Sequence, residues 1–205
     1  MDKIKDIKVP GYIHNPNVPY PQWLMYKSLL PKDICEKIIE LAKKIPAKDA
    51  TIFASDNKQV VNKSRKTQVR WILKDNEDFR ELFILVDKIV RSVNEGFKVN
   101  CNNVPSIQFT EYLEPGYRYD WHHDIDWNRT DGKSRKISFV IQLCDPETYT
   151  GGNFEFKHHE NPKLEDIRAQ GTAICFLPYH EHRVTSIESG TRYSLVGWYE
   201  GPNWV

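Results

Sequence analysis

Two stretches in the first half of the chain repeat apolar residues at the three- and four-residue spacing of a helix. The first begins at Pro31 and is expected to end at Pro46, because proline cannot continue a helix. The second runs from about Glu77 to Glu95, with Gly96 expected as its C-terminal cap. The stripes consist of Ile34, Ile38, Leu41, Ala42 and Ile45 in the first stretch, and of Phe79, Leu82, Phe83, Val86, Ile89, Val90 and Val93 in the second. Both helices are therefore predicted to cover one face of a sheet.

Short apolar runs separated by turn residues replace this pattern in the second half of the chain. Segments 114–116, 130–132 and 150–152 each contain glycine and supply turns. The runs predict strands over 107–112, 119–124, 137–143, 153–156, 172–176, 182–187 and 192–199, in addition to 23–26 and 66–73 earlier in the chain. Many short strands with frequent turns are typical of a sandwich or a barrel. The predicted fold class is therefore α+β and mainly β.

Residues 1–21 differ from the rest of the chain because they are rich in proline and asparagine. This composition predicts an extended arm that lies on the surface. Residues 22–205 are expected to form a single domain, since they suffice for one substantial core and show no internal repeat. A polar loop is expected at 54–59.

Charge and hydropathy argue against several classes of protein. The chain has 29 basic and 28 acidic residues, so its net charge of +1 gives no reason to expect nucleic acid or an anionic membrane as a partner. No run approaches the roughly 18 apolar residues of a membrane-spanning helix, and the first residues lack the apolar core of a signal peptide. Four cysteines without C-x-x-C spacing suggest buried free thiols. We expect a soluble cytoplasmic protein.

The stretch 119–127 gathers two imidazoles and three carboxylates. In a regular strand, His122 and Asp124 would point to one side and His123 to the other. A third ligand must come from elsewhere, and the candidate source is the second His-rich segment, which contains His182. Two histidines and one carboxylate leave coordination positions open, which suits non-haem Fe(II) in oxygen-activating enzymes. We call His122, Asp124 and His182 the triad.

Other assignments of these side chains are open at this point. A β-bulge would exchange His180 for His182, or His123 for His122. Asp126 is a candidate outer-shell acceptor on the metal side of the strand. A short His-x-Asp motif by itself is more often found in a surface loop than in a metal site. The residues that surround the motif are what favour the metal.

Arg192 is the first of these surrounding residues, and it follows His182 by ten positions in the apolar strand predicted at 192–199. An unpaired cation would be costly to bury there. A guanidinium in such a place needs a carboxylate, and its planar fork binds one in bidentate fashion. A dicarboxylate co-substrate would supply that carboxylate.

With these residues the chain resembles the Fe(II)/2-oxoglutarate-dependent dioxygenases, and within them the prolyl 4-hydroxylase-like branch that includes the PKHD-type hydroxylases. The resemblance is strongest over 106–201 and weaker over 23–97. The matching positions are Tyr112, Gly116, Tyr119, His122, Asp124, the strand 137–143 with 149–152 after it, His182, Arg183, Val184, Gly190, Arg192, Ser194 and Trp198. Ser186 departs from the pattern, since relatives often have proline there, and this affects only the local turn. The resemblance implies a double-stranded β-helix, or jelly roll, with the N-terminal helices packed on one sheet and the metal in its mouth.

The resemblance also implies the cofactors and the reaction. The triad would hold Fe(II), 2-oxoglutarate would chelate it, and Arg192 would hold the far carboxylate with Ser194 and Tyr112 as hydrogen-bond donors. The reaction consumes dioxygen, converts 2-oxoglutarate to succinate and CO2, and hydroxylates an unactivated C–H bond. Ascorbate or another reductant belongs to the family expectation, because it keeps the iron ferrous.

Three residues match family positions that contact the substrate, namely Tyr119, Trp198 and Arg65, the last in an Arg-x-Ser/Thr motif. An aromatic wall suits a prolyl ring, so the resemblance implies a prolyl residue of a peptide or protein as the substrate. Core packing is the competing explanation for Trp198, and simple exposure the competing one for Arg65. The alternative functions are a hydroxylase of a free amino acid or other small metabolite, and a catalytically silent metal-binding jelly roll. A zinc hydrolase would use the same ligands but leave Arg192 unexplained.

Overall fold

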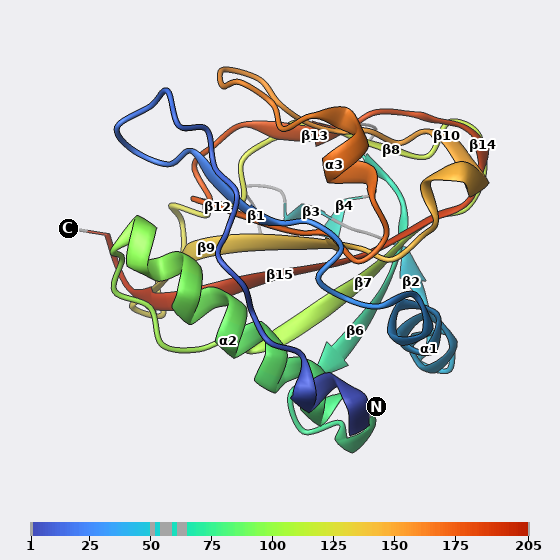
Figure 1. The fold of residues 1–205 in the computed structure, drawn as a ribbon, viewed down its shortest axis with the longest axis horizontal. Coiled ribbons are helices and arrows are strands. Elements are labelled where there is room, and N and C mark those ends of the chain that lie inside the picture. Colours follow the sequence, from blue (N-terminus) through green and yellow to red (C-terminus); the bar gives the residue numbers. More distant parts are fainter. Residues whose placement is uncertain (1, 50–51, 54–58, 61–64, 205) are drawn as a thin grey trace.

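The computed structural model describes residues 2–49, 52–53, 59–60 and 65–204. Two antiparallel sheets dominate it, and Figure 1 shows the small sheet with β8 and β13 above the large one. The large sheet has the order β1 (Trp23–Tyr26), β12 (Ala173–Phe176), β9 (Lys133–Gln142), β15 (Arg192–Pro202), β7 (Ser106–Tyr112), β6 (Gln68–Leu73) and β2 (Lys48–Asp49). The small sheet has the order β11 (Phe154–Phe156), β13 (His182–Val184), β8 (Arg118–His122) and β5 (Arg65–Lys66).

Two further pairs of short strands accompany the sheets. One joins β10 (Tyr149–Gly151) to β14 (Ile187–Gly190), and the other joins β3 (Ile52–Phe53) to β4 (Gln59–Val60). Apart from Gln59, the polar loop expected at 54–59 lies outside the described residues. The single strand expected at 182–187 is divided, because the chain leaves β13 after Val184 and pairs again only in β14.

Successive side chains of β15 point to opposite faces of the large sheet, and the two faces differ in polarity. Leu195 and Tyr199 belong to a buried cluster that also contains residues of both long helices. Arg192 and Ser194 occupy alternate positions and are buried on the opposite side, toward the small sheet. The apolar face therefore carries most of the core, and the polar face is turned to the space between the sheets.

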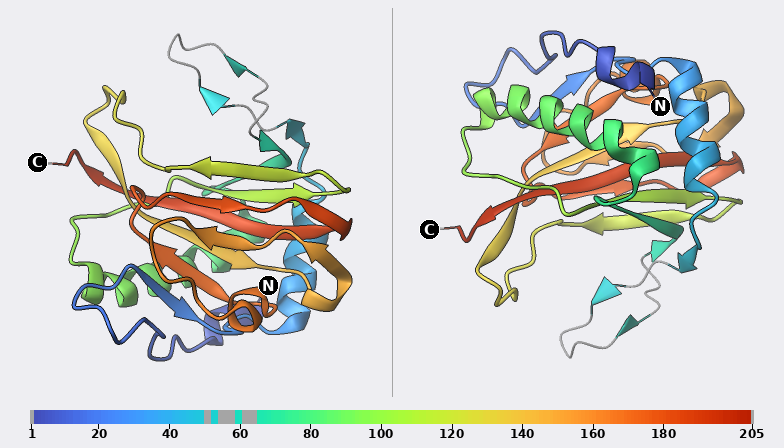
Figure 2. Two further views of the ribbon diagram at one scale, coloured as in Figure 1. Left: turned by 90° about the horizontal axis from the view of Figure 1, so that it is seen from above. Right: turned by 90° about the horizontal axis from the view of Figure 1, so that it is seen from below.

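The helices α1 (Lys32–Ala42) and α2 (Arg80–Phe97) lie on the apolar face, where α2 runs along the strands and α1 crosses them (Figure 2). All seven residues predicted for the stripe of the second helix are buried. The short helices are η1 (Asp2–Asp6), η2 (Glu77–Phe79), η3 (Pro146–Thr148) and α3 (Leu164–Arg168). Within the described part of the chain, no helix has the length and apolar content needed to cross a bilayer.

Both predicted C-terminal helix ends were wrong. The cap of α2 is Lys98, with a left-handed φ of 54°, and Gly96 lies inside the helix. A Cβ at Gly96 would come within 3.0 Å of Cδ1 of Leu24, so the close approach of β1 is what favours glycine there. Helix α1 ends at Ala42, before Pro46, where Arg70 donates a 2.9 Å hydrogen bond to the carbonyl of Lys43.

The first 21 residues were expected to be extended, but Asp2–Asp6 forms a 3-10 helix. Ile4 is fully buried in the helix-covered core, and Ile13 forms a β-bridge with Met25 of β1. This segment therefore contributes to the core as well as covering the surface. The four cysteines are free, and all but Cys101 are buried.

A candidate metal centre and co-substrate pocket

The two strands in the middle of the small sheet bring two histidines together. His122 is the last residue of β8, His182 is the first of β13, and they are direct cross-strand partners. Their ring centroids are 4.2 Å apart. Neighbouring strands in a sheet lie about 5 Å apart, so a directly opposed pair is the geometry that places two imidazoles on one ion.

Asp124 reaches the same point from outside the sheet. Strand β8 ends at His122, so the strand predicted at 119–124 was too long. The chain bends instead, and the backbone N–H of Asp124 donates to the carbonyl of Pro178 at 2.8 Å. This bend places Oδ1 of Asp124 3.7 Å from Nε2 of His122 and Oδ2 3.6 Å from Nε2 of His182.

Backbone carbonyls fix the orientation of both imidazoles. Nδ1 of His122 donates to the carbonyl of Asp120 at 2.8 Å, and Nδ1 of His182 donates to that of His180 at 2.9 Å. Because a carbonyl only accepts, the proton of each neutral ring lies on Nδ1 and the lone pair on Nε2. Both Nε2 atoms face Asp124, as second-sphere hydrogen bonds arrange them in metal sites.

Burial and neighbouring charges set the protonation of His122 and Asp124. Burial lowers the pKa of His122 to about 3, and His182 adds to this effect. For Asp124 burial alone would raise the pKa, but the two histidines and Arg135 outweigh it and lower the value to about 2. At neutral pH, His122 is therefore neutral and Asp124 is ionised, which are the forms that bind metal.

The triad fits an octahedral metal ion that keeps open positions. One candidate ligand atom from each residue lies within 4.8 Å of the others, and among the described residues this is the only such group of histidine, cysteine and acidic side chains. Oδ2 of Asp124 is buried and has no hydrogen-bond partner in the described structure. A cation would satisfy it. Two nitrogen ligands and one carboxylate suit non-haem Fe(II).

The other histidines lie away from this point. His123 is exposed and donates through Nδ1 to the carbonyl of Tyr179 at 2.8 Å. His180 forms a 2.6 Å hydrogen bond with His159. Neither therefore replaces a member of the triad in this structure. Asp126 accepts from the backbone N–H of Asn128 at 2.9 Å, which engages it in a local turn.

Arg192 is 1% exposed and lies 4.9 Å from the ring centre of Tyr112, its partner across the β15–β7 pair. Its Nη2 donates to Oε1 of Gln142 at 2.8 Å, whereas Nη1 is buried and lacks a partner among the described residues. Oγ of Ser194 is likewise buried and unpartnered. Gln142 thus occupies one side of the guanidinium fork. The free donors are Nη1 and the Ser194 hydroxyl.

Tyr119 and Arg65 form a stack beside His122. The Tyr119 ring lies 3.4 Å from the ring of His122, centre to centre, at an angle of 14°. The guanidinium carbon of Arg65 lies 4.4 Å from the centre of the Tyr119 ring. Arg65 also donates to Gln108 at 2.7 Å and to Thr67 at 2.9 Å, so it is held in place rather than free in solvent. Burial raises the pKa of Tyr119 to about 12, which keeps its hydroxyl protonated.

The ring of Trp198 stacks against the guanidinium of Arg135. The guanidinium carbon of Arg135 is 3.8 Å from the Trp198 ring centre, and Nη1 of Arg135 donates to the carbonyl of Asp124 at 2.9 Å. The indole nitrogen of Trp198 is buried and has no partner among the described residues. Arg135 therefore connects the aromatic wall on β15 to the backbone of a triad residue.

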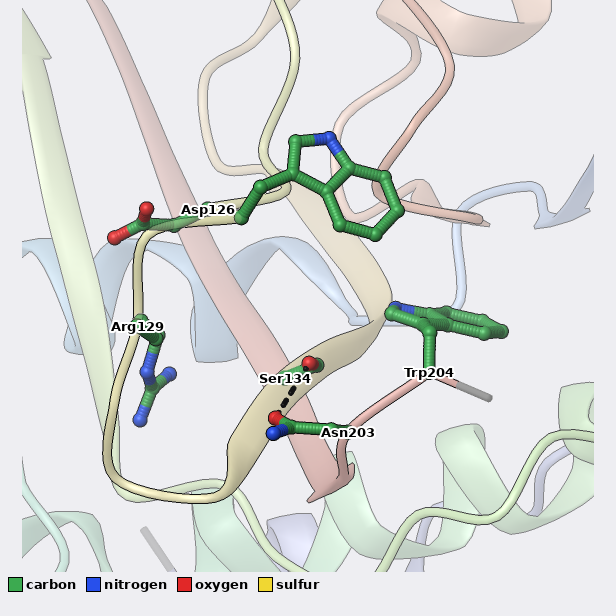
Figure 3. A pocket seen from close by; sticks show the side chains of 6 residues that line it. Asp126, Arg129, Ser134, Asn203 and Trp204 are labelled. Carbon is green, nitrogen blue, oxygen red and sulfur yellow. Dashed lines mark hydrogen bonds between the residues drawn. The ribbon is translucent and has the colours of Figure 1, made fainter.

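A cavity of about 170 Å³ opens beside the loop that follows Asp124. It is lined by Asp126, Trp127, Arg129, Ser134, Asn203 and Trp204 (Figure 3). The indole N–H of Trp204 donates to the carbonyl of Arg135 at 3.2 Å. Arg135 in turn donates to the carbonyl of Asp124, so Trp204 is linked to the triad through Arg135. Trp127 is 71% exposed, which leaves a large apolar surface at the cavity.

Sequence reasoning did not select Gln142, Arg135 or Pro178. A signal existed for Gln142, because it is a polar residue in the otherwise apolar run 137–143 and has the same strand parity as Ser138. Arg135 and Pro178 act through backbone carbonyls, which leave no such signal.

Two imidazoles and a carboxylate, each offering a ligand atom within 4.8 Å of the others, are a donor set that suits non-haem Fe(II). Residues 107–200 match the family model described as 2OG-Fe(II) oxygenase superfamily. The chain is also 25% identical over 142 residues to a PKHD-type hydroxylase of Picosynechococcus, covering 65% of this chain and 62% of that relative's length. These comparisons support a 2OG-Fe(II) oxygenase, and the residues that match the family model include the triad and Arg192.

Two solved structures share the fold. A prolyl-4-hydroxylase of Pseudomonas putida matches with a TM-score of 0.68 and 20% identity, over 89% of this chain and 94% of that one. A prolyl hydroxylase of Trichoplax adhaerens, solved in complex with a peptide fragment of the hypoxia inducible factor oxygen degradation domain, matches with a TM-score of 0.66 and 16% identity, over 87% and 83%. At these identities the likeness shows the fold: mainly β, antiparallel and prolyl 4-hydroxylase-like.

Proposed function

We propose that the protein is a 2-oxoglutarate-dependent Fe(II) dioxygenase that hydroxylates an unactivated C–H bond. The observation that carries the proposal is a set of buried polar atoms that have no partners in the described structure. Oδ2 of Asp124, an acceptor with negative charge, has no hydrogen-bond partner among the described residues. The donors Nη1 of Arg192 and Oγ of Ser194 have none either. Unsatisfied groups of this kind are costly in a folded protein. Iron and a dicarboxylate would satisfy both sets.

Each side chain has a role in this proposal. The triad would hold Fe(II), and when bound the metal supplies the redox chemistry that couples loss of CO2 from 2-oxoglutarate to hydroxylation. Arg192 and Ser194 would bind the far carboxylate of the co-substrate, with Tyr112 beside them. Tyr119 supports the His122 ring by stacking and stays protonated. The contribution of the chain is positioning, since a misplacement of about 1 Å can cost on the order of a hundredfold in rate.

The substrate we propose is a prolyl residue in a peptide or protein. Supporting observations are the aromatic side chains Tyr119 and Trp198, the guanidinium of Arg65 held by its hydrogen bonds, and the cavity lined by Trp127 and Trp204. The fold is also shared with two prolyl hydroxylases, one of them in complex with a peptide. Aromatic faces suit a pyrrolidine ring. We further propose that the two sheets form a double-stranded β-helix.

The test is turnover of 2-oxoglutarate by purified protein loaded with Fe(II), in the presence of dioxygen and with or without ascorbate. Succinate is measured alone and with proline-rich peptides, and each peptide is examined for a mass increase of one oxygen. We expect succinate formation that rises with a peptide and is lost in His182→Ala. Stimulation by a free amino acid instead would favour the small-metabolite hydroxylase. Metal binding without any succinate would overturn the proposal and leave a catalytically silent jelly roll.

A further inference from the structure

The backbone at Gly152 packs directly against the side chain of Arg192. Gly152 has a φ of +61°, and a Cβ there would lie 3.1 Å from Cδ of Arg192 and 2.5 Å from Cδ1 of Ile187. Both its conformation and its surroundings therefore exclude other residues. The aliphatic part of Arg192 rests on bare backbone, so the place of its guanidinium depends on where the loop 146–153 lies.

Arg168, from another element, is one of the groups that hold this loop, together with the pairing of β10 with β14 and the bond from the backbone N–H of Asn153 to Oγ1 of Thr185. Nη1 of Arg168, at the end of α3, donates to the carbonyl of Gly151 and to Oδ1 of Asn153, both at 2.7 Å. Nη2 donates to the carbonyls of Tyr149 at 2.9 Å and Pro146 at 3.1 Å. Only the planar fork of an arginine can direct donors to so many acceptors at once.

The Arg168 guanidinium is committed to this loop. It lies 4.3 Å from the ring centre of Tyr149, and no carboxylate among the described residues forms an ion pair with it. Its hydrogen bonds to neutral acceptors are charge-assisted and partly buried, so they are stronger than bonds between neutral groups.

The base of α3 is fixed in turn. Ile167 is 2% exposed within the core between the sheets. Lys27 forms a 2.5 Å ion pair with Asp166, and the hydroxyl of Thr172 donates to the carbonyl of Asp166 at 3.0 Å. The contacts thus run continuously from α3 to Arg192. Helix α3 holds Arg168, Arg168 donates four hydrogen bonds to the loop 146–153, and the backbone of this loop at Gly152 packs against Arg192.

We propose that Arg168 is a positioning residue that sets, through the loop 146–153, how far Arg192 reaches toward the triad, and thereby selects the length of the dicarboxylate co-substrate. The inference rests on the proposed function. The co-substrate spans two fixed points, the metal and the Arg192 guanidinium. If the loop becomes less constrained, the Arg192 guanidinium can lie farther from the metal. The affinity for a dicarboxylate with one more methylene then rises relative to the affinity for 2-oxoglutarate.

The experiment compares wild type with Arg168→Met, which keeps the aliphatic stem, and Arg168→Lys, which keeps the charge without the fork. Binding of 2-oxoglutarate and of 2-oxoadipate to Co(II)-loaded protein is measured by titration calorimetry. We expect 2-oxoglutarate affinity to fall roughly tenfold to a hundredfold in both variants, as for other outer-sphere partners. The preference for 2-oxoglutarate over 2-oxoadipate should fall by about tenfold, while Co(II) affinity is unchanged because Arg168 contacts no triad residue.

Two further variants complete the test. Gly152→Ala should weaken 2-oxoglutarate binding without touching Arg168, because the added Cβ presses on Arg192 and Ile187. Arg91→Met, an exposed arginine paired with Asp87 on α2, is the control and should change neither affinity nor preference. Folded Arg168 variants with unchanged preference would overturn the inference, as would a Gly152→Ala protein that binds normally. Failure of wild type to bind 2-oxoglutarate would instead overturn the proposed function.

Discussion

Nη2 of Arg192 donates a 2.8 Å hydrogen bond to Oε1 of Gln142, and both side chains are buried between the sheets. A neutral amide accepts this bond, and among the described residues no carboxylate forms an ion pair with Arg192. Gln142 therefore directs the guanidinium without neutralising it. The positive charge stays available for a ligand.

Replacing Gln142 by glutamate tests this arrangement. The new carboxylate would pair with Arg192 and repel the carboxylate of 2-oxoglutarate, so we expect affinity to fall by on the order of a hundredfold or more. Gln142→Leu, which removes only the orienting acceptor, should cost roughly tenfold. Titration calorimetry on Co(II)-loaded protein measures both. Equal binding by Gln142→Glu and wild type would show that Arg192 does not receive the co-substrate.

Metal binding should stabilise the folded protein through the triad. An ion that binds only the folded state at a concentration of 100 times its Kd adds about 2.7 kcal/mol to the free energy of unfolding. We expect the midpoint of thermal unfolding to rise with Co(II) or anaerobic Fe(II) and to return after chelation. His182→Ala and Asp124→Asn should lose the rise, and an equal rise in these variants would place the metal elsewhere.

Arg135 should tighten the metal centre through its bond to the carbonyl of Asp124. Arg135→Met removes that bond but keeps a side chain that can cover Trp198. We expect Co(II) affinity to fall about tenfold, because the bend that carries Asp124 is less constrained. Arg91→Met is the control, since Arg91 is an exposed arginine of α2 that pairs with Asp87. A larger loss in the control would refute the assignment.

The helix-covered side of the large sheet should contribute a pH-dependent part of stability. Burial alone would raise the pKa of Asp87, but hydrogen bonds from Arg91 and Tyr199 outweigh it, and the pKa is lowered. A carboxyl with a lowered pKa in the folded state stabilises the protein above its unfolded pKa and loses this effect as pH falls through the folded one.

The stability difference between wild type and Asp87→Asn should therefore be constant near neutral pH. It should shrink as the pH falls from the ordinary aspartate value of 3.8 toward and below the lowered folded value. Urea unfolding of both proteins over this range measures it. A difference that grows on acidification would contradict the assignment.

The elements predicted best from the sequence are those whose periodicity matches their burial. The stripe of α2 and the strand Trp23–Tyr26 appear as predicted because each buries an apolar face against the same core. The end of β8 could not be predicted, because the bend at Asp124 depends on the distant carbonyl of Pro178. The burial of Ile4 likewise depends on the surface that α2 offers after folding.

In the candidate site, too, local sequence spacing predicted some features, whereas contacts between distant strands determine others. Sequence spacing selected His122, Asp124 and His182, and the structure brings them within 4.8 Å; their role as ligands stays a prediction. Strand alternation could not choose between His180 and His182. The register of β13 on β8 makes that choice, since His182 lies opposite His122. The hydrogen bond from Arg192 to Gln142 likewise depends on the pairing of β9 with β15.

The most direct test of the central claim is anaerobic titration of Fe(II)-loaded protein with 2-oxoglutarate, monitored by the visible metal-to-ligand charge-transfer band. We predict a saturable band in wild type, no band in His182→Ala, and a much weaker affinity in Arg192→Ala. Absence of the band in iron-loaded wild type would contradict the account, and so would a band of undiminished affinity in Arg192→Ala.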